Sequence, residues 1–177
     1  MILLTCAIVQ GREIDCRDSI GGVQEITLTE FVNVPAANIT NSSGVITAAT
    51  CSTGKRFFTV LLEKENAQFD TKIITSVENG TTYCESTLTF TTKKMSAATK
   101  NWVLTLAYNR LHINVKDGNG TIWWMGLANG ADLTGAEGST GKSLGDFNGD
   151  TLTFTSKEPL PPQTLSAAIY AALKVGS

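Results

Sequence analysis

The stretch MSAATKNWVLTLAYNRLHINVKDGNGTIWWMG, residues 95–126, decides the fold, because it changes from a helical to an extended pattern within a few residues. Ser96 can cap a helix, which should end near Asn109. Apolar residues recur on about one face of a 3.6-residue period, at Met95, Ala98, Trp102 and Leu106. These features predict one amphipathic helix at about 95–109.

The second half of the stretch predicts a tight β-hairpin. Leu111, Ile113 and Val115 alternate with polar residues, so the chain should be extended here, with one apolar face. Residues 117–120 (DGNG) form a turn that leads into the aromatic strand at 122–125. A helix followed by a hairpin indicates a sheet with one helix packed on it.

Further strands are predicted on both sides of this stretch. Alternating or apolar runs occupy residues 2–9, 23–34, 45–50, 56–64, 71–77, 81–92 and 151–156. Asn79-Gly80 favours a two-residue hairpin turn, and the threonines at 87, 89 and 91 alternate with Leu88 and Phe90. The sequence therefore predicts a mainly β fold: an antiparallel β-sandwich or barrel with one packed α-helix and, optionally, a short C-terminal helix.

Two segments have the composition of exposed loops. Residues 35–44 (PAANITNSSG) are rich in turn formers and are a candidate assembly arm, and residues 130–150 carry six glycines without apolar periodicity. Prolines in KEPLPP, residues 157–162, should direct the chain out of the sheet. We predict a single domain over 1–177, with a tail at 160–177 that is mobile or orders on assembly.

Composition limits the function. The net charge of −2 and the isoelectric point near 5.4 give no basic surface for phosphates, so direct DNA binding is not expected. Residues 1–9 are apolar but lack the features of a secretion signal or a membrane span, and we expect no membrane anchor. The four cysteines form no CxxC pair, which leaves either reduced, mostly buried thiols or two disulfides.

The motifs that resemble catalytic or binding sites lack the context that their chemistry needs. AEGSTGKS, residues 136–143, matches a loosened phosphate-loop pattern, but we expect neither a strand before it, at 129–135, nor a long helix after it. The aspartates near 117–119 and 146–150 lack the closing glutamate of an EF-hand, and turn formation explains them. We therefore expect no cofactor and no metal.

His112 is the only histidine, so a histidine-based metal cluster or catalytic triad would depend on it alone. It lies on the polar face of the predicted strand, where a solvated or interface position is expected. No paired acid and base can be named, so enzymatic activity is not expected. Trp123 and Trp124 are neighbours on a strand and should point to opposite faces. One can fill the core, while the other needs the helix, a partner subunit or a ligand.

The order of elements from the helix onward resembles the C-terminal half of phage major tail tube proteins. The matching residues are Asp117, Asn119, Gly120, Gly126, Gly141, Gly145, Asp146, Asn148, Gly149, Thr151–Thr155, Glu158 and Pro159. Ser139 departs from the pattern, because it stands where that family's loop has its first glycine. Residues 11–31 are also similar to the openings of Bacteroidetes-phage virion proteins.

The resemblance implies a virion structural protein, made in the bacterial host cytoplasm, that assembles into hexameric rings. The rings would stack into a tube, meet other tail proteins and conduct DNA without binding it specifically. Residues 33–54 and 130–150 are then candidate contact loops. The candidate contact residues are Pro35, Asn38, Asn41, Trp123, Trp124, Asp132, Lys142, Asp146, Pro159 and Pro161.

Two other classes of function remain open at this point. The first is a β-sandwich binding module, such as a fibre or carbohydrate-binding domain that stacks a sugar on an exposed tryptophan. The second is a small hydrolase, which the lack of a nameable acid and base disfavours.

Overall fold

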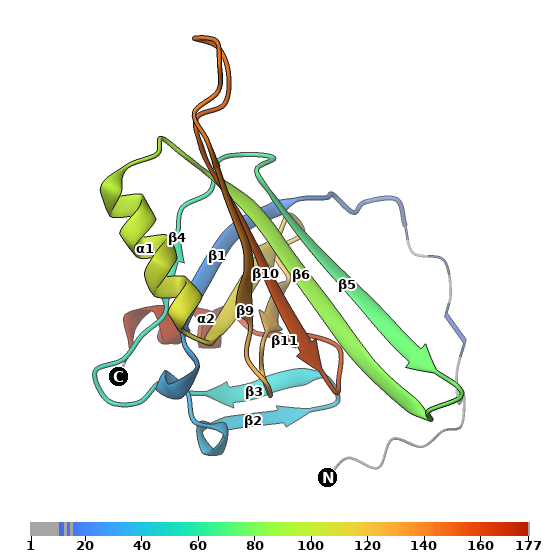
Figure 1. Cartoon of the computed structure of the whole chain (residues 1–177). Coiled ribbons are helices and arrows are strands. Elements are labelled where there is room, and N and C mark those ends of the chain that lie inside the picture. The colour runs from blue at the N-terminus through green and yellow to red at the C-terminus, as the bar shows by residue number, and fades with distance from the viewer. Residues whose placement is uncertain (1–10, 13, 15, 177) are drawn as a thin grey trace.

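Two antiparallel-rich sheets lie face to face in the computed structural model, which describes residues 11, 12, 14 and 16–176 (Figure 1). The elements, in chain order, are β1 (Val23–Glu30), the 3₁₀ turns η1 (Phe31–Asn33) and η2 (Ala36–Asn38), β2 (Ile39–Ser42), β3 (Val45–Ala49), β4 (Phe58–Val60), β5 (Ala67–Ser76), β6 (Thr81–Lys93), α1 (Ala97–Tyr108), β7 (Leu111–Asp117), β8 (Ile122–Met125), β9 (Asp132–Ser139), β10 (Gly149–Glu158), β11 (Gln163–Leu165) and α2 (Ala167–Val175). The prediction of a mainly β, two-layer fold is confirmed.

The larger sheet has seven strands, in the order β2-β3-β11-β8-β7-β1-β4. Its pairs are antiparallel except β11 with β3, which is parallel. The smaller sheet has four antiparallel strands, in the order β5-β6-β10-β9. Neither sheet closes into a barrel in the described part of the chain. The hairpin predicted at 111–125 lies near the middle of the larger sheet, as β7 and β8.

The main core fills the space between the two sheets and is apolar. The smaller sheet contributes Leu88, Phe90, Leu152 and Phe154, and the larger sheet contributes residues such as Ile113. Alternation explains this, because every second residue of β6 and β10 points inward. The predicted threonine strand is confirmed: Leu88 and Phe90 are buried, and the threonines between them face outward.

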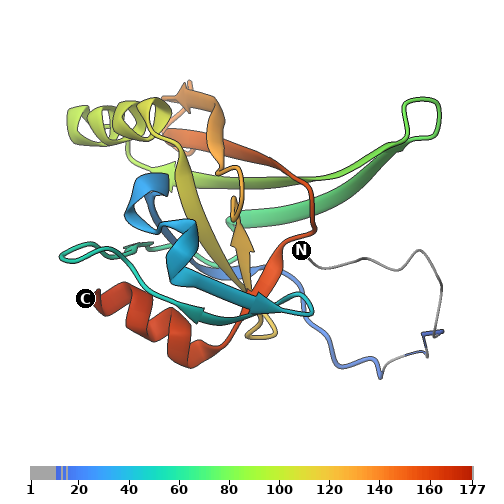
Figure 2. The same cartoon turned by 90° about the horizontal axis from the view of Figure 1, so that it is seen from below.

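A second core covers the other face of the larger sheet, so that α2 forms a third layer (Figure 2). Tyr170 and Leu173 of α2 pack there with Trp124. Ser166 caps α2 by accepting a hydrogen bond from the Ile169 backbone N–H. The optional C-terminal helix therefore exists, and much of the expected tail at 160–177 belongs to the packed structure as β11 and α2.

Helix α1 lies beside the small sheet, where the sequence predicts it. The Ser96 side chain accepts a hydrogen bond from the Thr99 backbone N–H (3.1 Å) and so caps the helix. The buried side chains are Val103 and Leu106, with Trp102 half-buried, whereas Ala98 is exposed. The buried face is thus turned slightly from the one that the periodicity indicates.

Several local predictions are wrong. His112 is not solvated: it is 1% exposed, because Phe31 stacks on its ring, Trp124 packs edge-on against it, and the Val34 carbonyl lies beside Nε2. Residues 77–80 form a four-residue loop, since Ser76 pairs directly with Thr81, so Asn79-Gly80 is not a two-residue turn. The segment 56–64 forms only the three-residue strand β4. The strand expected at 2–9 lies outside the described residues.

Both predicted loops contain strands. Residues 132–139 form β9, and β10 begins at Gly149, so the irregular part of 130–150 shrinks to the connection at 140–148. Small residues do not prevent β9, because it is an edge strand that makes a ladder with β10 alone. Residues 39–42 likewise pair with β3 as β2. Glycine and threonine can form the backbone hydrogen bonds of a β-ladder, but they do not produce an alternation of apolar residues. The sequence pattern therefore predicted no strand at these positions.

Candidate assembly surface

The outward face of the four-stranded sheet is a ladder of threonine pairs. Three pairs lie directly opposite each other on β6 and β10: Thr91 with Thr151, Thr89 with Thr153, and Thr87 with Thr155. The Thr89 and Thr153 hydroxyl oxygens are 3.4 Å apart, and Thr134 of β9 adds a hydroxyl 2.9 Å from that of Thr155. Cross-strand threonine pairs stabilise a sheet while keeping its surface polar and uncharged. The centre of this face therefore carries hydroxyls and no charge.

Charged residues flank this ladder: Asp70 of β5 lies opposite Thr87, and Glu137 of β9 lies opposite Thr151. Lys157 lies 3.8 Å from Glu85, and Asp70 accepts hydrogen bonds from the Gln68 side chain. Lys157 and Glu85 thus offset each other, whereas the partner of Asp70 is an uncharged amide. The face offers no basic cluster that would hold phosphate groups.

Neither edge strand of the four-stranded sheet has a strand partner on its outer side, although α1 packs beside β9. β5 pairs only with β6, and β9 pairs only with β10, among the strands that the structure describes. β5 has 10 residues and β9 has 8, so the two edges have similar lengths. An open edge presents unpaired backbone N–H and C=O groups and is a template for another strand.

Two hairpins extend the small sheet in opposite directions. Gly149 pairs with Lys93 at one end of the ladder, where the β9–β10 connection projects; we call residues 140–148 the finger (Figure 1). At the other end, residues 71–82 of β5 and β6 project beyond the core; we call them the arm (Figure 2). The arm carries exposed Ile73 and Val77.

The finger is braced by its own side chains. The Asp146 carboxylate accepts hydrogen bonds from the backbone N–H groups of Lys142 and Ser143, both at 2.8 Å, and these bonds lower the pKa of Asp146. Asn148 accepts a hydrogen bond from the Met95 backbone N–H (3.0 Å), which ties the base of the finger to the start of α1. Leu144 lies at the tip, fully exposed.

The residues shared with the tail tube pattern build turns. Asp117 accepts hydrogen bonds from the backbone N–H groups of Asn119 and Thr121, at 3.0 and 2.8 Å. Gly126 has a φ of +77°, and a Cβ there would lie 2.6 Å from a backbone nitrogen. These contacts explain the turn-forming residues without any ligand.

Glu158 has a similar structural role. Its buried carboxylate accepts hydrogen bonds from the backbone N–H groups of Ala128 (2.9 Å) and Asn129 (2.9 Å) and so fixes the connection from β8 to β9. Burial raises the pKa of Glu158, against the lowering effect of the backbone N–H groups.

The two tryptophans of β8 point to opposite faces, as predicted. Trp124 is 1% exposed in the second core. It therefore cannot contact another subunit while the fold is intact. Trp123 is half-buried, and its Nε1 donates a hydrogen bond to Asp117 (3.1 Å). Neither ring is free for stacking on both sides.

The other predicted contact residues do not form one site, although Asn41, Pro159 and Pro161 line one small pocket with Trp124. Lys142 and Asp146 belong to the finger, and Asp132 begins β9. The remaining ones are distributed over the 3₁₀ turn η2 and β2 and over the connection from β10 to β11: Pro35, Asn38, Asn41, Pro159 and Pro161. Asn38 and Asn41 make internal hydrogen bonds, to the Thr50 carbonyl and to Gln163.

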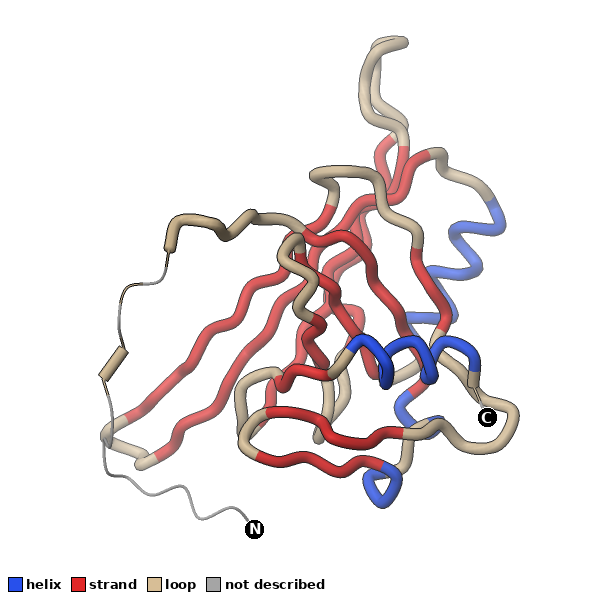
Figure 3. The backbone as a smooth tube through the Cα atoms, turned by 180° about the vertical axis from the view of Figure 1, so that it is seen from behind, coloured by secondary structure: helices blue, strands red, loops and turns tan. Residues whose placement is uncertain are grey.

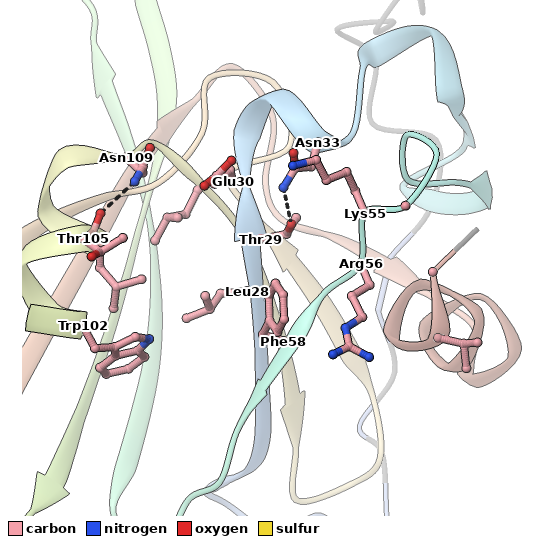
Figure 4. A pocket seen from close by; sticks show the side chains of 15 residues that line it. Leu28, Thr29, Glu30, Asn33, Lys55, Arg56, Phe58, Trp102, Thr105 and Asn109 are labelled. Atoms are coloured by element: carbon pink, nitrogen blue, oxygen red, sulfur yellow. Dashed lines mark hydrogen bonds between the residues drawn. The ribbon is translucent and has the colours of Figure 1, made fainter. Parts of the chain in front are cut away.

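A groove opens at the end of α1 that lies away from the finger (Figure 4). Its volume is about 720 Å³, and it lies between α1, β1, β4 and the end of α2. Leu28, Phe58 and Trp102 supply apolar surface, Glu30 lies on one side, and Lys55 and Arg56 lie on the other. Sequence patterns missed this groove, because it arises where β4 begins only at Phe58, opposite Leu28, and leaves the last residues of β1 without a partner on that side.

The loosened phosphate-loop match has no matching geometry, since residues 136–139 belong to β9 and no helix follows the finger. The expectation that residues 129–135 hold no strand is wrong, because β9 begins at Asp132. Within the described residues, no three or more His, Cys, Asp or Glu side chains gather as metal ligands. Cys51 and Cys84 are buried, and Cys16 is exposed.

No helix in the described part of the chain is both long enough and apolar enough to cross a membrane. No protein-family model, curated protein or solved structure matches this chain.

Proposed function

We propose that this protein is a tail tube subunit that works by self-assembly into stacked rings around a channel. The observation that carries the proposal is the four-stranded sheet, which combines an uncovered hydroxyl face with two open edges of similar length. The resemblance of its turn motifs to phage tail tube proteins agrees with this reading.

The two edge strands of the four-stranded sheet can supply the contact that closes a ring. If β9 of one copy lies beside β5 of the next, the contact is heterologous, and a constant rotation between copies closes a ring. Closure also removes both open edges, which a lone subunit would leave as sites of aggregation. The threonine ladder would then line the inner wall.

Such a wall suits DNA passage. Hydroxyl groups stay hydrated and carry no charge, so they neither hold nor strongly repel phosphates. The charges that flank the ladder are the carboxylates of Asp70 and Glu137, which repel phosphates, whereas Lys157 lies beside Glu85. In this role the protein needs no cofactor and no catalytic group.

Negative-stain microscopy of the purified full chain tests the proposal. Rings or tubes with a central hole are expected, and a protein that stays monomeric at high concentration contradicts it. Two neighbouring proline variants, Thr71→Pro and Lys72→Pro, sharpen the test. Successive residues of an edge strand direct their N–H groups alternately to the partner strand and to the open edge. One of the two variants therefore loses an N–H that bonds to β6, and the other loses an N–H at the open edge. The variant that keeps the wild-type melting temperature is the one that lost the edge N–H, and it should no longer form rings.

The alternative of a sugar-binding module has to use other residues than those of β8. In the described structure, the groove holds Trp102 and Phe58 beside polar side chains, an arrangement suited to a sugar. Glycan-array binding that disappears in Trp102→Ala, from a protein that forms no rings, would favour this alternative.

A further inference from the structure

We propose that the finger of one copy docks by Leu144 into the groove of the next copy, and that this contact stacks one ring on another. The inference rests on the proposed function, and it assigns the two surfaces that the stacking contact uses.

The finger presents an apolar anchor in a fixed position. Leu144 is fully exposed, on a connection that Asp146 closes through two backbone hydrogen bonds. Such a braced tip loses little conformational freedom on docking. A large exposed side chain on a preorganised tip is suited to fill an apolar pocket in a partner.

The groove has the matching apolar surface. Leu28 lies at its floor, and the half-buried Trp102 and the exposed Phe58 form its sides. Its volume of about 720 Å³ exceeds what one leucine side chain needs, so neighbouring finger residues can enter as well.

Charges on the two surfaces are complementary. The finger carries Lys142 and the Asp146 carboxylate, while the groove carries Glu30 on one side and Lys55 and Arg56 on the other. A docked finger can therefore place Lys142 toward Glu30 and Asp146 toward the basic side. In the opposite orientation both contacts would be repulsive, so charge fixes how the finger enters.

The two surfaces do not overlap, because the finger adjoins the start of α1 and the groove borders the C-terminal half of that helix. Asn148 contacts Met95 at the start of α1, whereas the groove involves Asn109 at the end of that helix. Figure 1 shows the finger at the top and α1 descending from it toward the end that borders the groove. The contact is thus head-to-tail, and it repeats along an axis without using up either surface.

The experiment uses two variants of the full chain that block one surface each. Leu144→Ser removes the anchor, and Thr105→Trp places a large side chain in the groove from an exposed position on α1. Each variant should form single rings that do not stack, with the ring-to-ring dissociation constant raised at least tenfold. Purified rings of the two variants, when mixed, should form pairs of rings and nothing longer, because one intact finger surface meets one intact groove.

Charge exchange supplies the matched control. Lys142→Glu and Glu30→Lys should each weaken stacking, and the chain carrying both should recover it. Glu78→Lys makes the same charge change as Glu30→Lys in the exposed loop at the end of the arm and should leave stacking unchanged.

The outcomes separate the two proposals. Stacks of normal length from Leu144→Ser rings, or no pairing in the mixture, overturn the finger–groove contact while leaving ring formation intact. If the wild-type chain forms no rings, the proposed function fails. The contact is then tested by sedimentation velocity of the mixed variant monomers, where one-to-one pairs support it and their absence overturns it.

Discussion

Stability should depend on pH through His112, whose surroundings favour the neutral ring. Trp124 Nε1 donates a hydrogen bond to His112 Nδ1 (3.1 Å), and His112 Nε2 lies 3.3 Å from the Val34 carbonyl oxygen. His112 Nδ1 also lies 2.8 Å from the Gly126 carbonyl oxygen. A proton on Nδ1 can be donated to that oxygen but removes the acceptor of the Trp124 N–H, so burial is the main reason that the neutral ring is favoured. Burial lowers the pKa of His112, and backbone carbonyls oppose this only in part.

The direction of this pH dependence follows from how many protons the folded and unfolded states bind. Below pH 6.5 the unfolded chain holds a proton on His112 that the folded protein lacks, so stability falls as the pH falls toward the lowered pKa of the folded state. The slope reaches about 1.4 kcal/mol per pH unit. Over one unit this is a substantial share of the roughly 5–15 kcal/mol that stabilises a typical domain.

Urea unfolding of the wild type and of His112→Gln and His112→Phe, from pH 8 to pH 5, measures this effect. Both variants are expected to be less stable at pH 8, but their loss of stability below pH 6.5 should largely vanish. Since the chain has no other histidine, the difference between the curves isolates this group. Glu158, with its raised pKa, favours the folded state as the pH falls, but it does so equally in all three proteins. Parallel curves for wild type and variants would refute the argument.

Three further changes test how turns and caps hold the sheets. Gly126→Ala should lower the free energy of unfolding in urea by about 2–5 kcal/mol, because the new side chain meets both a positive φ and a backbone clash. Gly120→Ala, at a positive φ in open space, should lower it by only about 1–2 kcal/mol. Equal losses in the two variants would contradict this. Asp117→Ala should lower the free energy of unfolding by about 1–3 kcal/mol. It should also shift the fluorescence emission of Trp123 to longer wavelength, because the indole N–H loses its hydrogen-bond acceptor. Unchanged emission would argue against that hydrogen bond. Ser96→Ala should cost about 1 kcal/mol by thermal unfolding, through loss of the α1 cap, and leave rings intact.

The sequence predicted those elements whose local signal agrees with their surroundings. Ser96 marks the start of α1, and the alternation of Leu88 and Phe90 with threonines marks the strand that faces the core. β9 escaped prediction because its residues are small and polar, and only its partner β10 determines that it is extended. The groove and the arm depend on where strands stop relative to one another, which no local pattern records.

His112 shows why the polar face of a strand cannot be equated with solvent. In β7, Leu111, Ile113 and Val115 face the apolar core, as the alternation indicates, yet the residues between them are buried too. The part of the α2-covered face that β1 and β7 form is polar: Thr27 lies opposite Asn114 across these strands, and Lys174 of α2 forms an ion pair with Glu25 at 2.5 Å. In β7 the alternation therefore separates an apolar buried face from a polar buried face, and it does not separate buried residues from exposed ones.

The C-terminal segment explains why both faces of the larger sheet are buried. β11 joins β3 to β8 across the larger sheet, and α2 then lies over the polar side of β1 and β7 (Figure 3). Without this segment the sheet would lose a central strand, and Trp124 would lose its packing against Leu173. Residues 163–175 are therefore part of the structural core of the subunit, and the surfaces available for assembly are those that this core leaves uncovered: the threonine face, its two edges, the finger and the groove.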